Sequence, residues 1–296
     1  ALAYWQTQDN EVKQADALYE LSRAYHRNDN DDEALVSIQQ AFDYYKKWGT
    51  SEALPKVHHR IALLNIQNRA FDVAKQELDT GLKLAELHEN WEIWGNCQTL
   101  LGDMSLIQQD YQKSIKYYQN ALKGYETAKN NKGLAEVYQN IGRILFMHNQ
   151  ADKAMTSYEQ ARYHLNEAEN YDDLAMLDIR IGRMCEQKSQ YDEALAYFQS
   201  AIEGFVKSGN QFELTNAYIQ KAYIHEEKKE FTLMLNCYQS ALKPAQQSDN
   251  EALLHSIEDG IEHAESLVAK HQNKHQTNGQ ATKNKGLLGT IKGWFK

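Results

Sequence analysis

The sequence predicts an all-α protein, a right-handed superhelical solenoid of antiparallel helix pairs. The first observation is a period of 40 residues that runs through most of the chain without an insertion, and its clearest column holds only small residues: Ser22, Ala62, Gly102, Gly142, Gly182 and Ala222. The second is composition, because only 2 prolines and 15 glycines among 296 residues leave long stretches of helix-forming residues. A strict period of this length is typical of stacked repeats.

Each repeat is expected to contain two helices. In the fourth repeat, apolar and small residues between Leu134 and Leu145 follow the helical period, and Ala154, Tyr158 and Ala161 form the stripe of a second helix. The large residue of that second helix recurs as Ile38, Leu78, Tyr118, Tyr158, Phe198 and Tyr238. Small residues on facing helices allow close approach, so we expect each repeat to pack as an antiparallel hairpin.

The junctions between repeats form a column of their own. It holds Thr50 in one repeat and asparagine in the others: Asn10, Asn90, Asn130, Asn170, Asn210 and Asn250. Asparagine tolerates the left-handed conformation that ends a helix and also caps the next helix. The column therefore predicts where each repeat ends.

The period divides the chain into segments. Residues 1–14 are expected to be the end of an upstream repeat, since Ala1 falls in the column of Ala41, and residues 15–250 form six repeats. We therefore interpret the sequence as a piece of a longer protein.

After Asn250 the period weakens, because Glu262 falls in the column of small residues. We expect a capping helix at 251–268, a flexible basic linker at 269–285 and a short amphipathic basic helix at 286–296.

Charge and composition exclude several classes of function. Six lysines and no acid follow Ala269, which leaves a formal charge of −15 for residues 1–269 out of a net −9, so nucleic acid is not an expected partner. Three scattered cysteines predict buried thiols in a reducing, cytoplasmic location, and no apolar run is long enough to span a membrane. No metal site, cofactor motif or catalytic constellation is present in the sequence, so we expect no enzyme.

The repeat resembles the tetratricopeptide repeat. The resemblance covers residues 15–245 and depends on the small residue at the eighth position, alanines at the twentieth and twenty-seventh, and aromatic residues that open the second helix: Phe71, Tyr111, Tyr191 and Phe231. Forty residues exceed the usual 34, which is similar to the subclass found in Leu-Gly-Asn-repeat adaptors, kinesin light chains and bacterial Rap-type regulators. The resemblance implies a concave groove, lined by the first helices of the repeats, that binds a peptide.

The groove residues are predicted from the face of each first helix opposite its core stripe. In the fourth to sixth repeats this face carries arginine and amide side chains beside apolar ones: Gln139, Asn140, Arg143, Phe146, Ile179, Arg180, Arg183 and Tyr223. Arginine presents a planar fork of donors to a carboxylate, so the expected ligand is an acidic protein or peptide segment. The alternative is that the arginines pair with neighbouring acids such as Glu136 or Glu186, or are simply solvated.

The C-terminal segment has an amphipathic pattern. Its apolar residues recur at helical spacing beside a lysine, and the predicted docking residues are Leu287, Leu288, Ile291, Lys292, Trp294 and Phe295. Docking to an anionic membrane surface, docking into a groove of a partner or of the chain itself, and an idle end all remain open. Because a short anchor binds weakly, homo-oligomerisation would strengthen attachment to the inner face of a membrane.

The sequence thus predicts a non-enzymatic cytoplasmic adaptor that binds a peptide in its groove. The alternative is a Rap-like signalling regulator whose solenoid changes shape when a peptide binds. A third alternative is a subunit whose catalytic domain lies upstream of residue 1.

Overall fold

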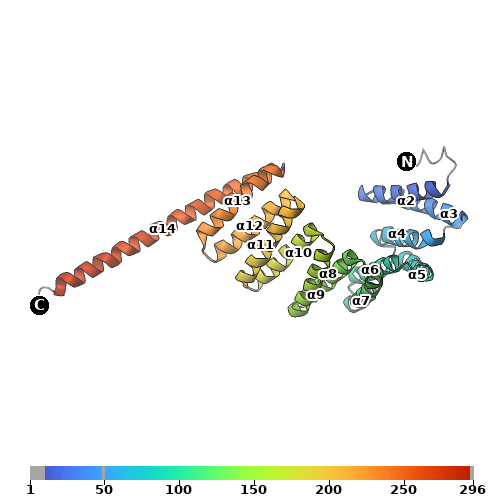
Figure 1. Ribbon diagram of the computed structural model, residues 1–296, viewed down its shortest axis with the longest axis horizontal. Coiled ribbons are helices and arrows are strands. Elements are labelled where there is room, and N and C mark those ends of the chain that lie inside the picture. Colours follow the sequence, from blue (N-terminus) through green and yellow to red (C-terminus); the bar gives the residue numbers. More distant parts are fainter. Residues whose placement is uncertain (1–10, 49–50, 294–296) are drawn as a thin grey trace. The chain divides into compact units, whose positions relative to one another are not determined.

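The computed structural model describes residues 11–48 and 51–293, with side chains described as far as Gln272 (Figure 1). Within these ranges the chain forms thirteen α-helices and one 3-10 helix at Ser51–Ala53, and no strand. The chain divides into two compact units, of which unit 1 ends at Ala168 and unit 2 begins at Glu169. The all-α class is therefore confirmed.

The helices form successive antiparallel pairs in each unit. Unit 1 contains α2 (Glu11–Arg27), α3 (Asp31–Lys47), α4 (Leu54–Gln67), α5 (Phe71–Leu87), α6 (Trp91–Ile107), α7 (Tyr111–Ala128), α8 (Asn131–Met147) and α9 (Ala151–Glu167). Unit 2 contains α10 (Tyr171–Gln187), α11 (Tyr191–Ser208), α12 (Gln211–Glu227), α13 (Phe231–Gln247) and α14 (Glu251–Gly293). Each pair is one 40-residue repeat, and the four aromatic residues expected to open second helices are the first residues of α5, α7, α11 and α13.

The core of a repeat depends on a close contact between its two helices. A Cβ atom added to Gly142 of α8 would lie 2.6 Å from the ring of Tyr158 in α9, and one added to Gly182 of α10 would lie 2.5 Å from the ring of Phe198 in α11. Both rings are buried. The small-residue column is therefore required by the large side chain that faces it.

In the sixth repeat the large ring is accommodated by a different glycine. Its small position is Ala222, although its large residue is Tyr238. Here the ring lies against α14, where a Cβ on Gly260 would lie 2.5 Å from the Tyr238 ring. The glycine that accommodates the ring therefore comes from the next helix.

The junction asparagines are N-caps. The side chain of Asn130 accepts a hydrogen bond from the Gly133 amide at 2.9 Å, and the equivalent bonds are made by Asn90, Asn170, Asn210 and Asn250. The left-handed residue is the one before the asparagine, since φ is 54° at Lys129 and −93° at Asn130. The asparagine caps the next helix, and the residue before it ends the previous helix in the left-handed conformation. Asn10 and Thr50 lie outside the described residues.

Helix α14 packs on α13 through Ile257 and Ala264, both buried, while Glu262 is exposed. Its backbone is helical through residues 269–285, where the sequence predicted a flexible linker. A helix already formed extends without a new nucleus, and no proline interrupts this stretch. The side chains of the predicted docking residues at 287–292 are not described, and Trp294 and Phe295 lie outside the described residues, so the separate role of 286–296 stays a prediction.

Candidate binding surface

The first helices of the repeats carry the predicted ligand residues, and in unit 1 these lie on α8. Gln139, Asn140 and Phe146 are half-buried, and Arg143 is exposed. The Arg143 guanidinium donates a long hydrogen bond of 3.4 Å to the Asn140 side-chain oxygen. One turn of helix thus brings together an arginine and an amide.

Arg143 also influences an acid on the preceding first helix. Asp103 of α6 accepts a 2.5 Å hydrogen bond from the Tyr118 hydroxyl. Burial raises the pKa of the Asp103 carboxyl, whereas the Tyr118 hydrogen bond and the positive charge of Arg143 lower it. Arg143 forms no ion pair with any carboxylate of the described residues. Its charge therefore faces solvent beside an acid that is already hydrogen-bonded to a tyrosine.

In unit 2 the predicted residues lie on α10 and α12. Ile179 is buried at 8% exposure, whereas Arg180 and Arg183 are exposed and Tyr223 is 47% exposed. The Arg183 Nε donates to the Gln220 side-chain oxygen at 3.1 Å, which joins α10 to α12. Met176, one turn before Ile179, is 39% exposed. This surface therefore presents arginines beside exposed apolar side chains, and Ile179 belongs to the core beneath it.

The two arginines in the same column share one property. Arg183, like Arg143, is bonded to a neutral amide and forms no ion pair with a carboxylate of the described residues. For Arg143 and Arg183, pairing with Glu136 or Glu186 is therefore not what the structure records. The eight predicted groove residues therefore divide into four on unit 1 and four on unit 2.

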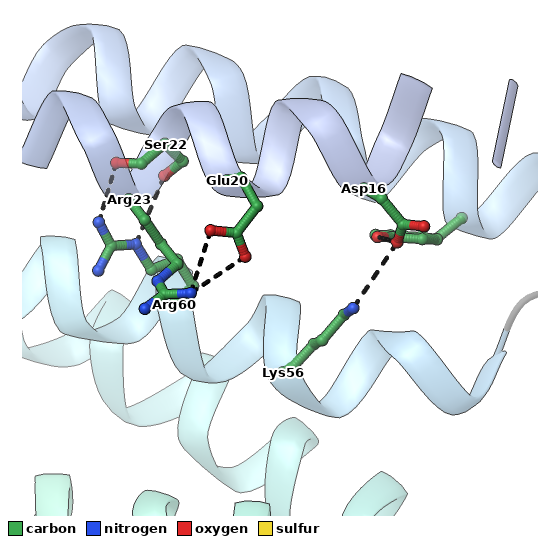
Figure 2. Close-up of polar contacts among 7 residues, drawn as sticks. Asp16, Glu20, Ser22, Arg23, Lys56 and Arg60 are labelled. Carbon is green, nitrogen blue, oxygen red and sulfur yellow. Dashed lines mark hydrogen bonds and ion pairs between the residues drawn. The ribbon is translucent and has the colours of Figure 1, made fainter. Parts of the chain in front are cut away.

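A third polar cluster, between α2 and α4 of unit 1, was not predicted. Figure 2 shows the contacts: the Lys56 Nζ lies 3.8 Å from the Asp16 carboxylate, and Arg23 pairs with Glu20 at 3.0 Å. Lys56 also lies over the Tyr19 ring at 5.0 Å. Asp16 and Lys56 are opposite charges one period apart, a signal that was present in the sequence.

Arg60 is the buried member of this cluster. It is 7% exposed, and its Nη2 donates to the Ser22 carbonyl oxygen at 2.9 Å (Figure 2). Burial lowers the pKa of the Arg60 guanidinium. Burial and the charge of Arg60 together lower the pKa of the adjacent His59 to about 4, so His59 is neutral at physiological pH. The charges of this cluster are largely engaged with one another or buried.

Other kinds of site find little support in the described part of the chain. No three His, Cys, Asp or Glu side chains within it are grouped to hold a metal ion. None of its helices combines the length and apolar character needed to cross a bilayer. The three cysteines are buried as free thiols, and burial raises the pKa of each.

Comparison with known proteins identifies the repeat. The sequence model of the tetratricopeptide repeat matches residues 96–162, which run from within α6, the first helix of the third repeat, to within α9. These residues are therefore tetratricopeptide-like repeats. No curated protein matches this repeat protein in sequence.

Solved structures share its fold at low sequence identity. BtubC from P. vanneervenii has a TM-score of 0.55 and 15% identity, over 82% of this chain and 93% of that one. A signal transduction ATPase with numerous domains and a tetratricopeptide repeat sensor, from Pyrococcus horikoshii, has a TM-score of 0.65 and 13% identity, over 92% of this chain and 44% of that one. A Rap protein complexed with competence and sporulation factor has a TM-score of 0.54 and 11% identity, over 88% and 76%. At these identities the similarity concerns the fold.

Proposed function

We propose that this repeat protein is a non-enzymatic protein-interaction scaffold whose first helices bind an acidic protein segment. The observation that carries the proposal is that Arg143 and Arg183, in the same column of successive repeats, are hydrogen-bonded to amides and not to carboxylates. A carboxylate is the ligand that best matches the planar guanidinium fork. The exposed Met176 and Tyr223 beside Arg183 provide apolar contacts for the same ligand.

The test is selection of a displayed random peptide library on the full chain. Selected peptides should be rich in Asp and Glu, and Arg183→Glu should weaken their binding by about tenfold or more, because reversal turns an attraction into a repulsion. Arg143→Glu tests the α8 surface of unit 1 in the same way. Lys243→Glu is the control, since Lys243 is exposed on the second helix α13.

Circular dichroism must show that each variant keeps its helix content. Unchanged affinity in both arginine variants would remove these surfaces as the ligand site. Selected peptides without acidic residues would remove the proposed ligand chemistry.

A peptide-sensing regulator is the second candidate function. It is favoured by the division into two compact units, and by the fold shared with a Rap protein whose structure was solved with a signalling factor. Solution scattering with a selected peptide distinguishes the two functions. A regulator changes its radius of gyration when it binds the peptide, whereas a passive scaffold keeps it.

The C-terminal segment is the second part of the proposal. Its apolar residues and lysines at 286–296 suit a docking helix for a membrane surface or a partner. Such a segment would place the scaffold and its bound protein at a defined location.

A further inference from the structure

An apolar groove lies between α2 and α3 of unit 1. Its volume is about 420 Å³, and its floor is formed by Leu18, Leu21 and Tyr25. Val36 of α3 lines the same groove and is 59% exposed, although it is a β-branched apolar residue in the middle of a helix. The groove therefore offers a surface that no described part of this chain covers.

The rim of this groove is acidic. Residues 29–33 contain four acids in five positions, and Asp32 and Glu33 line the groove. Asp31 is engaged with His26, whose Nδ1 lies 2.8 Å from its carboxylate. Asp32 and Glu33 are exposed and form no ion pair with any cation of the described residues. The groove thus combines an apolar floor with uncompensated negative charge.

The same chain contains a segment of complementary chemistry. After Ala269 there are six lysines and no acid, and the apolar residues of 286–296 recur at helical spacing. The backbone of α14 is helical as far as Gly293, which lies about 33 Å along the helix axis from His271, whose ring packs on Phe231 of α13 with centroids 5.6 Å apart, at about 1.5 Å per residue. As long as α14 stays helical, this segment cannot fold back onto α13. A continuous α14 therefore leaves this segment available to another surface.

We propose that the groove between α2 and α3 binds residues 286–296 of a second copy of this chain. The apolar residues of the segment cover Val36 and the apolar floor, and its lysines lie against Asp32 and Glu33. Such a contact is head-to-tail, so one end of an assembly keeps a free groove and the other end a free segment, and assembly grows with concentration. This inference rests on the docking role proposed for the C-terminal segment and is independent of the arginine surfaces.

The test places a photo-cross-linker in the groove of the full chain. Val36→p-benzoylphenylalanine is suitable because Val36 is exposed, and equal amounts of this variant and of ¹⁵N-labelled wild type are mixed before irradiation. We expect cross-linked peptides that contain residues 286–296 and carry the heavy label. Val73→p-benzoylphenylalanine is the matched control, because Val73 is a 46% exposed valine on the second helix of the next repeat. It should give no such product.

Charge provides the second arm. Asp32→Lys with Glu33→Lys should lower the cross-linking yield by about fivefold or more, and added salt should lower it in the wild type. Cross-links to residues 1–10, cross-links only within one copy, or no cross-links would each overturn the inference. So would sedimentation of the full chain with phosphatidylserine vesicles in the absence of groove cross-links, because that result assigns the segment to a membrane. Acidic-peptide binding measured on the same sample is expected to be unaffected, which separates this inference from the arginine surfaces.

Discussion

The contact between a small residue and a large ring can be tested by adding one methyl group. In Gly182→Ala, the new Cβ would lie 2.5 Å from the Phe198 Cε1 and 2.8 Å from its Cδ1, so the ring or the backbone must move by about 1 Å to restore ordinary contact. Overpacking of this kind costs about 1–3 kcal/mol. Alanine regains about 1 kcal/mol through its higher helix propensity. We therefore expect a net loss of up to about 2 kcal/mol.

The assay is hydrogen exchange of the full chain, followed by mass spectrometry of peptides from α10 and α11. A repeat array does not unfold in one step, so a local measurement is more informative than a single midpoint. The expected loss corresponds to exchange up to about 30-fold faster in these two helices. Gly81→Ala is the control, because its Cβ would meet its nearest neighbours at 3.3 and 3.4 Å and the five other repeats have alanine in that column.

The chain itself suggests the rescue. Ala62 and Leu78 occupy the same two columns in the second repeat, and both are fully buried. Phe198→Leu should therefore make Gly182→Ala far less harmful, with a coupling of about 1 kcal/mol or more between the two changes. Slower exchange in Gly182→Ala, or a double variant no better than the sum of the single ones, would refute the reasoning.

Two further predictions concern the α2–α4 cluster. Because burial lowers the pKa of His59 to about 4, the unfolded chain binds a proton near pH 6.5 that the folded chain does not, so stability should fall as the pH is lowered from about 6.5 to 4. His59→Gln, which copies Gln139 of the same column, should flatten the dependence of the urea midpoint on pH, and equal slopes would contradict this. Arg60→Leu should be neutral or stabilising, because a buried cation without a carboxylate partner is replaced by the residue found at Leu100 in the same column. A loss above about 2 kcal/mol in urea unfolding of unit 1 would show that the hydrogen bonds to Ser22 outweigh the desolvation cost.

The repeat architecture was predictable because packing constraints recur with the period. A column such as Gly102, Gly142 and Gly182 is visible in the sequence because each of these glycines faces a ring in its own repeat. Gly260 was not predicted, since it belongs to α14 and compensates for Tyr238 of the preceding helix. When the glycine that faces a ring is supplied by a different helix, comparing the same column in each repeat does not reveal it.

The binding surfaces were only partly predictable. The face of Arg143 and Arg183 follows from helical geometry, but their partners depend on side-chain reach, and both arginines select an amide over the nearby acids. Ile179 was expected at the surface and is buried. The exposed face of the helix is narrow, so the column that contains Ile179 lies at the edge of the core. The Asp16–Lys56 pair between α2 and α4 was missed although both residues lie in one column, because that column was not compared for charge.

The turns of this protein have a consequence for how such a chain changes its length. The junctions from Asn90 to Asn250 each place a left-handed residue before an asparagine N-cap, as at Lys129 and Asn130, and Glu169 and Asn170 repeat the arrangement 40 residues later. Recombination that joins one such asparagine to another therefore preserves the turn on both sides of the cut. A graft made at these asparagines should therefore fold where a graft inside a helix would not.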